Sequence, residues 1–123
     1  MATYRANCAY GRYFQKNVLV HVDRRLKYMP YAKAGYRLFA DGTYIVLVSY
    51  ETDVIAIDLT RKIMQCTGTY SPITRKHIRS FLREMSGLYG FPVEHCNYHT
   101  AEAVAHTGKA VSLLNGNTVE GWL

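Results

Sequence analysis

Cysteine is scarce in this 123-residue chain, and the three cysteines that occur are widely spaced. An odd count at Cys8, Cys66 and Cys96 does not match the disulfide framework of a small secreted domain. Long apolar runs are missing as well: no segment approaches the roughly 20 apolar residues of a membrane span, and the first residues do not resemble a signal peptide. We therefore expect a protein of a reducing, cytoplasmic compartment that does not contact a membrane.

Motifs of the common enzyme classes are also missing. The chain contains no G-x-S-x-G turn, no Walker-type phosphate loop and no G-x-G-x-x-G after a strand. His77 is a candidate general base, but no Asp or Glu lies within three residues of it to orient the ring. We predict that the His77 ring has a structural role, bridging a helix and a sheet, and we expect a non-enzymatic protein without a cofactor.

A metal site is the weaker interpretation of the segment HCNYH at residues 95–99. Cys96 and His99 have a spacing that zinc sites use. A tetrahedral site needs two further ligands, and no second pair exists, so Cys8 or Cys66 would have to join singly. A buried free cysteine and a surface histidine explain the same residues, and we predict no bound metal.

Positive charge is what the chain has in excess, and it is concentrated in two blocks. The formal net charge is +6. Residues 1–37 contain eight bases and one acid, residues 38–60 four acids and no base, and residues 61–83 six bases and no acid. If folding brings the two basic blocks together, they form a cationic patch suited to phosphates or to an acidic protein. If they lie on opposite faces, the charges are only solvated.

Alternating apolar residues predict an antiparallel sheet in the first half of the chain. Residues 17–22 have the pattern of a half-buried N-terminal strand. Residues 36–51 have the pattern of two strands joined at Asp41-Gly42, because a glycine takes a positive φ in a tight turn without a Cβ penalty.

The β pattern continues over residues 53–59 and 62–68, which completes a predicted meander from residue 36 to residue 68. Alternation places Glu51 and Asp53 on one face of a strand. We interpret this face as the solvated side of the sheet, not as an acid pair for catalysis.

The main helix is predicted over about residues 72–86. Ser71 suits the N-cap and Pro72 the first helical position. Gly87 is placed to end the helix. Apolar residues at intervals of three and four predict one buried stripe, formed by Ile78, Phe81, Leu82, Met85 and Leu88.

A shorter helix is predicted over about residues 100–107, with Thr100 as its N-cap, and a final hairpin is predicted to turn at Asn115-Gly116. Strands followed by helices and a hairpin predict an α+β fold, with the helices on one face of an antiparallel sheet. The chain has no repeat or linker, so residues 1–123 are expected to form a single domain.

Cations and tyrosines are interleaved before the sheet, and cations recur every four residues on the main helix. Cations neutralise phosphates, and tyrosine faces stack on bases, although tyrosine is also favoured at protein interfaces. The candidate residues for binding nucleic acid or a partner protein are Arg24, Arg25, Lys27, Tyr28, Tyr31, Lys33, Arg37, Arg75, Lys76, Arg79 and Arg83.

Two stretches, LVSYETDVIAID and YSPITRKHIRSFL, carry a resemblance over about residues 43–82. The matching positions are Ser49, Tyr50, Thr52, Val54, Ala56, Tyr70, Ser71, Thr74, Lys76 and His77, with Ile73 as a departure from the pattern. These positions resemble a family of small, mostly uncharacterised proteins encoded by bacteriophages and prophages. The resemblance implies a setting in a bacterial host cell and no particular reaction.

Small phage proteins without catalytic motifs often act by occupying a host surface. Our leading hypothesis is a non-enzymatic phage-type protein that blocks a host defence nucleoprotein, in its sharpest form an anti-CRISPR inhibitor. The alternative is a small basic protein that binds DNA or RNA directly. The third hypothesis is a nucleic-acid-processing enzyme that uses His77 or the Cys96 and His99 pair. A homodimer is compatible with each of them.

Overall fold

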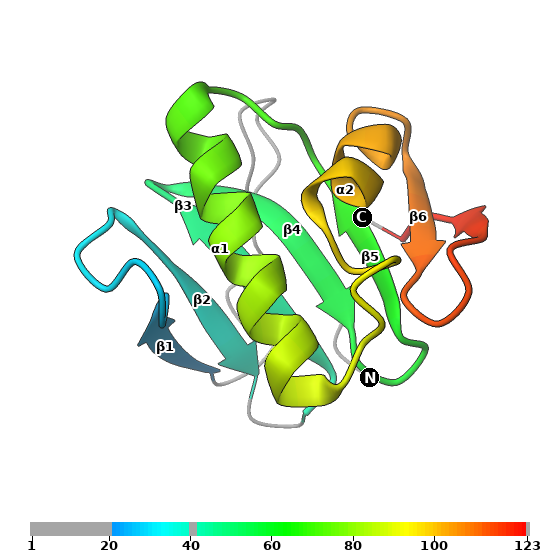
Figure 1. Cartoon of the computed structure of the whole chain (residues 1–123), viewed down its shortest axis with the longest axis horizontal. Helices are drawn as coiled ribbons and strands as arrows, with labels where there is room; N and C mark the ends of the chain where they lie inside the picture. The colour runs from blue at the N-terminus through cyan, green and yellow to red at the C-terminus, as the bar shows by residue number, and fades with distance from the viewer. Residues whose placement is uncertain (1–20, 40–41, 123) are drawn as a thin grey trace.

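The computed structural model describes residues 21–39 and 42–122. In this part of the chain, seven strands form one antiparallel sheet whose spatial order follows the sequence, and two helices lie on the same face of that sheet (Figure 1). The predicted α+β fold is therefore confirmed. The strands are β1 (His21–Arg25), β2 (Ala34–Phe39), β3 (Tyr44–Ser49), β4 (Thr52–Asp58), β5 (Ile63–Cys66), β6 (Lys109–Ser112) and β7 (Thr118–Glu120), and the helices are α1 (Pro72–Tyr89) and α2 (Tyr98–Val104).

The predicted meander corresponds to β2 to β5, and the predicted C-terminal hairpin to β6 and β7. Gly42 has a φ of 73° and its N–H bonds to the Phe39 carbonyl, as expected of the first hairpin. Its neighbour Asp41 lies outside the described residues. Of the predicted N-terminal strand over residues 17–22, His21 and Val22 belong to β1, and residues 17–20 lie outside the described residues.

Helix α1 begins as predicted and ends later. The Ser71 side chain accepts from the Thr74 N–H, and Pro72 occupies the first turn. Gly87 stays helical, and Gly90 caps the helix instead, with a φ of 71° and its N–H on the Ser86 carbonyl. The chain then turns back so that Phe91, which is 5% exposed, enters the core.

The buried stripe of α1 is confirmed at Ile78, Phe81, Leu82 and Met85, all at most 1% exposed. Leu88 was wrongly assigned to it and is 61% exposed, whereas Phe91, just after the helix, is buried in the core.

Helix α2 starts two residues before the predicted Thr100. Asn97 is its N-cap: the Asn97 Oδ1 accepts from the N–H of Thr100, which therefore lies inside the helix. The helix ends at Val104, so the sequence pattern placed the whole element too late. Among the described residues, no helix combines the length and apolar character that a membrane span requires.

The main core lies between the sheet and the two helices, and a smaller cluster of Phe39, Val46 and Ala56 lies on the other face. Asp53 is only 2% exposed, so our interpretation of its face as solvated was wrong. Asp53 lies near the Arg37 guanidinium, and a bulge between Leu47 and Val48 shifts the register along β3. Alternation alone does not reveal such a shift.

Gly35 is required by a close approach of two strands. A Cβ atom there would lie 2.5 Å from the Arg24 carbonyl oxygen. We expect Gly35→Ala to lower the free energy of unfolding by about 1–3 kcal/mol in urea denaturation. The matched control is Gly87→Ala in α1, where a Cβ meets nothing within 4 Å; it should raise stability by about 0.5–1 kcal/mol. Equal effects of the two substitutions would contradict this account.

Candidate functional site

The loop between β1 and β2 is docked on α1. Leu26 is fully buried in the main core, and a short bridge to Met29 folds the loop into a tight turn. Lys27, which follows Leu26, donates its backbone N–H to the Glu84 carboxylate on α1 at 2.7 Å. The first basic block is thus held against the helix that contains the second.

Glu84 is buried, and a second donor satisfies its carboxylate. The Tyr36 hydroxyl on β2 donates to the other Glu84 oxygen at 2.8 Å. Burial, together with the bond to Glu84 and the charge of Glu84, raises the pKa of Tyr36 to about 12. The hydroxyl therefore stays protonated and remains a donor near neutral pH.

Aromatic contacts order the cations on this surface. The Arg83 guanidinium lies over the Tyr28 ring at 4.0 Å, and the Lys27 amino group lies 5.5 Å from the same ring. A guanidinium stacked on a ring keeps the N–H groups at its edge accessible to an anion. The contact between Tyr28 and Arg83 joins segments more than 50 residues apart in sequence, which places the two predicted basic blocks in one surface.

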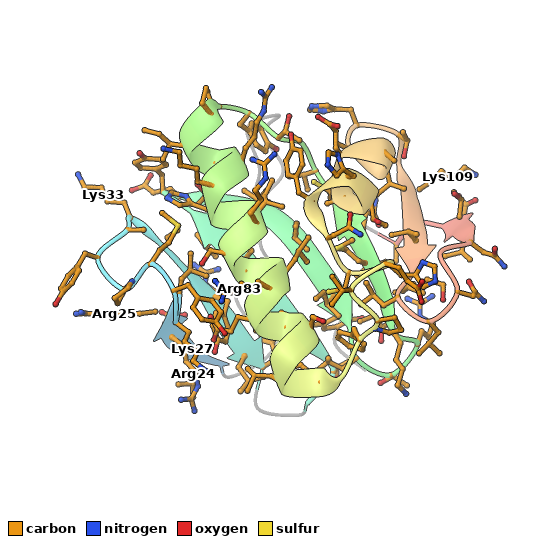
Figure 2. The ribbon with its side chains drawn as sticks, viewed as in Figure 1. Arg24, Arg25, Lys27, Lys33, Arg83 and Lys109 are labelled. Atoms are coloured by element: carbon orange, nitrogen blue, oxygen red, sulfur yellow. The ribbon has the colours of Figure 1, made fainter. Side chains whose placement is uncertain are left out.

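We call this the cationic surface and define it by seven exposed cations. Figure 2 shows several of them around β1 and α1, with Lys109 at the far end of the sheet. Residues 24–37 contain no acid, and the single acid of α1 is the buried Glu84. The members are Arg24, Lys27, Lys33, Arg75, Lys76, Arg79 and Arg83. Arg25 is exposed as well, but it lies two residues after Asp23 in β1, so strand alternation places it on the face opposite the helices.

The other predicted binding residues have different positions. Tyr31 is 93% exposed at the tip of the loop, and Tyr28 is 41% exposed beneath Arg83. Arg37 does not join the cationic surface: it pairs in register with Asp23, on the face of the sheet opposite the helices, and its guanidinium lies 3.7 Å from the Asp23 carboxylate. Consecutive strand residues point to opposite faces, so Tyr36 faces α1 and Arg37 faces away.

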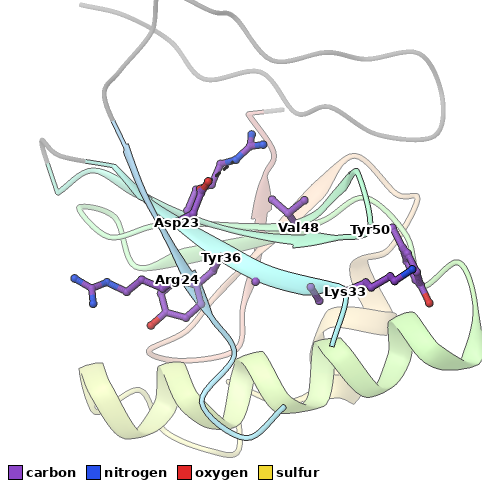
Figure 3. Close-up of a pocket in the computed structure, with 9 residues that line it drawn as sticks. Asp23, Arg24, Lys33, Tyr36, Val48 and Tyr50 are labelled. Carbon is purple, nitrogen blue, oxygen red and sulfur yellow. Dashed lines mark ion pairs between the residues drawn. The ribbon is translucent and has the colours of Figure 1, made fainter. Parts of the chain in front are cut away.

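A cavity of about 280 Å³ lies at this corner of the sheet. Arg24 and Tyr36 extend toward α1, Asp23 and Val48 extend to the other face, and Lys33 and Tyr50 form one end (Figure 3). The Tyr50 N–H bonds to the Lys33 carbonyl at 2.7 Å. Because Asp23 and Arg37 line it as an ion pair, this cavity has a mixed charge, and it shares only Arg24 and Lys33 with the cationic surface.

Sequence reasoning missed two residues of the site, Glu84 and Tyr98. Glu84 is a single acid on a basic helix, and only the tertiary structure shows what it bonds. Tyr98 on α2 packs its ring under the Arg79 guanidinium at 4.1 Å, so Arg79 extends toward α2 while Arg83 extends toward the loop. Tyr98 is the first residue of α2, directly after the N-cap Asn97. The sequence pattern placed the start of this helix at Thr100 and therefore did not include Tyr98.

His77 bridges helix and sheet, as predicted. Its ring Nδ1 shares a hydrogen bond of 2.8 Å with the Ser49 hydroxyl on β3, and Ser49 shares another of 3.1 Å with Thr74. Tyr50 follows with a φ of 57° and places its ring 6.0 Å from the imidazole. His77 and Ser49 are each only 2% exposed, so this serine–histidine pair is closed to a substrate.

Cys96 and His99 do not converge on a metal site. Among the described residues, no cluster of three or more His, Cys, Asp or Glu side chains is arranged to hold an ion. The Cys96 thiol is buried and donates to the Leu82 carbonyl, and burial raises its pKa to about 12, whereas His99 is exposed. A neutral, buried thiol is a poor metal ligand and a poor nucleophile.

We expect Glu84 to contribute more than any other single side chain to the docking of the β1–β2 loop on α1. We expect Glu84→Ala to lower the free energy of unfolding by about 2–4 kcal/mol, since two donors lose their acceptor in a buried position. Hydrogen exchange at the Lys27 and Tyr28 amides should accelerate. Glu94→Ala, at an exposed acid, is the control and should change stability by less than about 0.5 kcal/mol. Unchanged exchange in Glu84→Ala would show that the loop is held by other contacts.

Burial lowers the pKa of His77 from its usual 6.5. The unfolded chain therefore binds a proton at this imidazole more readily than the folded protein does. The free energy of unfolding should rise with pH up to about 6.5, and the His77 titration should not change it further above that pH. Urea denaturation between pH 4.5 and 8 should show this rise in the wild type and in His99→Gln. His77→Gln should be less stable at pH 8 and should have a flatter profile. An unaltered slope in His77→Gln would assign the titration to another group.

Comparison with known proteins identifies a family and no activity. No curated protein and no solved structure matches the chain. A family model described as a family of unknown function (DUF8033) matches residues 15–90, which is more than half of the chain and includes β1 to β5 and α1. The cationic surface lies within this match, whereas α2 and the last hairpin lie outside it. The chain belongs to this family of unknown function.

Proposed function

We propose that this protein is a non-enzymatic binding protein whose cationic surface contacts the phosphate backbone of a nucleic acid. The single observation that carries the proposal is the docking of the β1–β2 loop on α1. That docking brings seven exposed cations of the two segments into one surface, and these segments contain no exposed acid. Phosphate neutralisation by Lys and Arg is the main source of affinity in such contacts.

The arginine geometry supports a phosphate partner. Arg79 and Arg83 are stacked on tyrosine rings at 4.1 and 4.0 Å, so their planes are ordered before a ligand arrives, and less side-chain entropy is lost on binding. The highly exposed ring of Tyr31 stands in the same loop and offers a face on which an unpaired base stacks.

A protein partner is the second candidate, and one observation favours it: an apolar groove opens beside Arg79 and Arg83. This candidate includes our leading sequence hypothesis, a phage-type inhibitor of a host defence nucleoprotein such as an anti-CRISPR protein acting in the bacterial cytoplasm. The phage setting and the resemblance motifs belong to this hypothesis and not to the family match.

Binding of labelled 20-nucleotide single strands and duplexes, measured by fluorescence anisotropy, tests the proposal. The double variant Lys27→Gln/Arg83→Gln should lose at least about tenfold in affinity near 100 mM salt. Its log–log salt slope should fall by about 2, since each contact to duplex DNA contributes about 0.9. The charge-matched control is Lys62→Gln/Lys109→Gln, which removes two exposed cations outside the cationic surface.

Equal losses of affinity in the two double variants would show that binding depends only on net charge. That result would contradict a defined binding surface. Absence of binding to every probe at 50 mM salt would reject the nucleic-acid proposal. The inhibitor hypothesis predicts a different result, which is co-elution with one host complex from a nuclease-treated bacterial lysate.

A further inference from the structure

A groove of about 320 Å³ lies between the C-terminal half of α1 and the segment that leads into α2. Figure 1 shows this segment running beside the helix after the chain has turned at the end of α1. The volume is near the lower end of the range for ligand sites, so the groove accommodates one large side chain and not an extended ligand. Its floor and walls include Leu82, Val93, Cys96 and Tyr98, with Arg79 and Arg83 at the rim.

The floor of the groove is apolar and chemically inert. Leu82 is 1% exposed and Cys96 is 2% exposed. The Cys96 thiol donates to the Leu82 carbonyl, and its raised pKa keeps it neutral. A buried neutral thiol packs as a small apolar group, so the floor carries no charge.

Apart from the exposed His99 imidazole, the polar side chains of the walls are already bonded within the protein. The Asn97 Oδ1 accepts from the Thr100 N–H at 3.0 Å, and the Asn97 Nδ2 donates to the Val93 carbonyl at 2.8 Å. The Ser86 hydroxyl donates to the Phe91 carbonyl at 2.6 Å. A polar group placed deep in the groove would therefore lose its hydrogen bonds to water without adequate replacement. The inserted part of a ligand must be apolar.

The rim has the opposite character. Arg79 and Arg83 are one helical turn apart, both are exposed, and both are stacked on tyrosine rings. Among the described residues, the lining of the groove contains no acid. The part of the ligand that stays outside the groove must therefore carry negative charge, and carboxylates match the fork of a guanidinium.

Apolar side chains continue beyond the groove. Val93 is 70% exposed on the groove wall, and Leu88 and Tyr89, at 61% and 42%, are exposed at the end of α1. Because Val93 is largely exposed at the wall, apolar surface is present outside the groove as well as in it, which favours a polypeptide partner.

We propose that the groove binds an acidic peptide segment of a partner protein. One large apolar side chain of the peptide seats on Leu82 and Val93, and flanking carboxylates bind Arg79 and Arg83. This site goes beyond the proposed nucleic-acid function and does not depend on it. Because both ligands use the same two arginines, peptide and nucleic acid compete when both are present.

Selection from a displayed library of random 12-residue peptides tests the proposal, with nuclease-treated protein as bait. Val93→Glu serves as the counter-selection bait, because Val93 is exposed and its replacement leaves the core intact. Wild-type protein should enrich peptides that combine several Asp or Glu residues with one Leu, Phe or Trp. No enrichment over Val93→Glu, or enrichment of acidic residues without an apolar one, would overturn the proposal.

The selected peptides provide the quantitative measurement. Their affinity should fall at least tenfold in Val93→Glu, severalfold in Arg79→Gln, and remain unchanged in Lys109→Gln. NMR amide shifts should appear at Leu82, Val93 and Cys96. If an oligonucleotide shifts these amides and the peptides do not, the groove serves nucleic acid and the proposal is wrong. Peptide binding without any oligonucleotide binding would support the groove and reject the nucleic-acid function alone.

Discussion

The buried carboxylate of Glu84 is the contact on which the candidate site depends. A carboxylate removed from water is costly unless hydrogen bonds replace its hydration. Here the Lys27 N–H and the Tyr36 hydroxyl supply them, from a loop and from a strand that are distant from Glu84 in sequence. The bond from Lys27 fixes the loop on the helix, and the bond from Tyr36 fixes β2 on it. Without them, like charges on Lys27 and Arg83 would favour separation of the two segments.

Much of the fold follows from local signals that tertiary packing does not override. Alternating apolar residues predicted β2 to β5, and Ser71 with Pro72 predicted the start of α1, because these patterns act over a few residues. The helix ends were less predictable. Gly87 and Gly90 are both suitable caps, and the burial of Phe91 selects the later one. Asn97 and Thr100 are both suitable N-caps, and the sequence does not rank them.

The sequence predicted most of the residues of the candidate site, but not how they come together. The residues of both basic blocks were identified from sequence, but their convergence depends on Glu84, Tyr28 and the packing of Leu26, which no local pattern reveals. Arg37 was a predicted binding residue, but it does not join the cationic surface, because strand alternation places it on the opposite face from its neighbour Tyr36. His77 was predicted correctly, because the absence of nearby acids already favoured a structural role.

We propose that the two separate basic blocks act as one binding surface. Amide chemical-shift mapping by NMR during titration with a 12-nucleotide single strand tests this claim most directly. One joint surface should give simultaneous shifts in the β1–β2 loop and along α1, with a single dissociation constant, and none in β7. Shifts confined to one of the two blocks, or shifts on the face that carries Arg37, would contradict it.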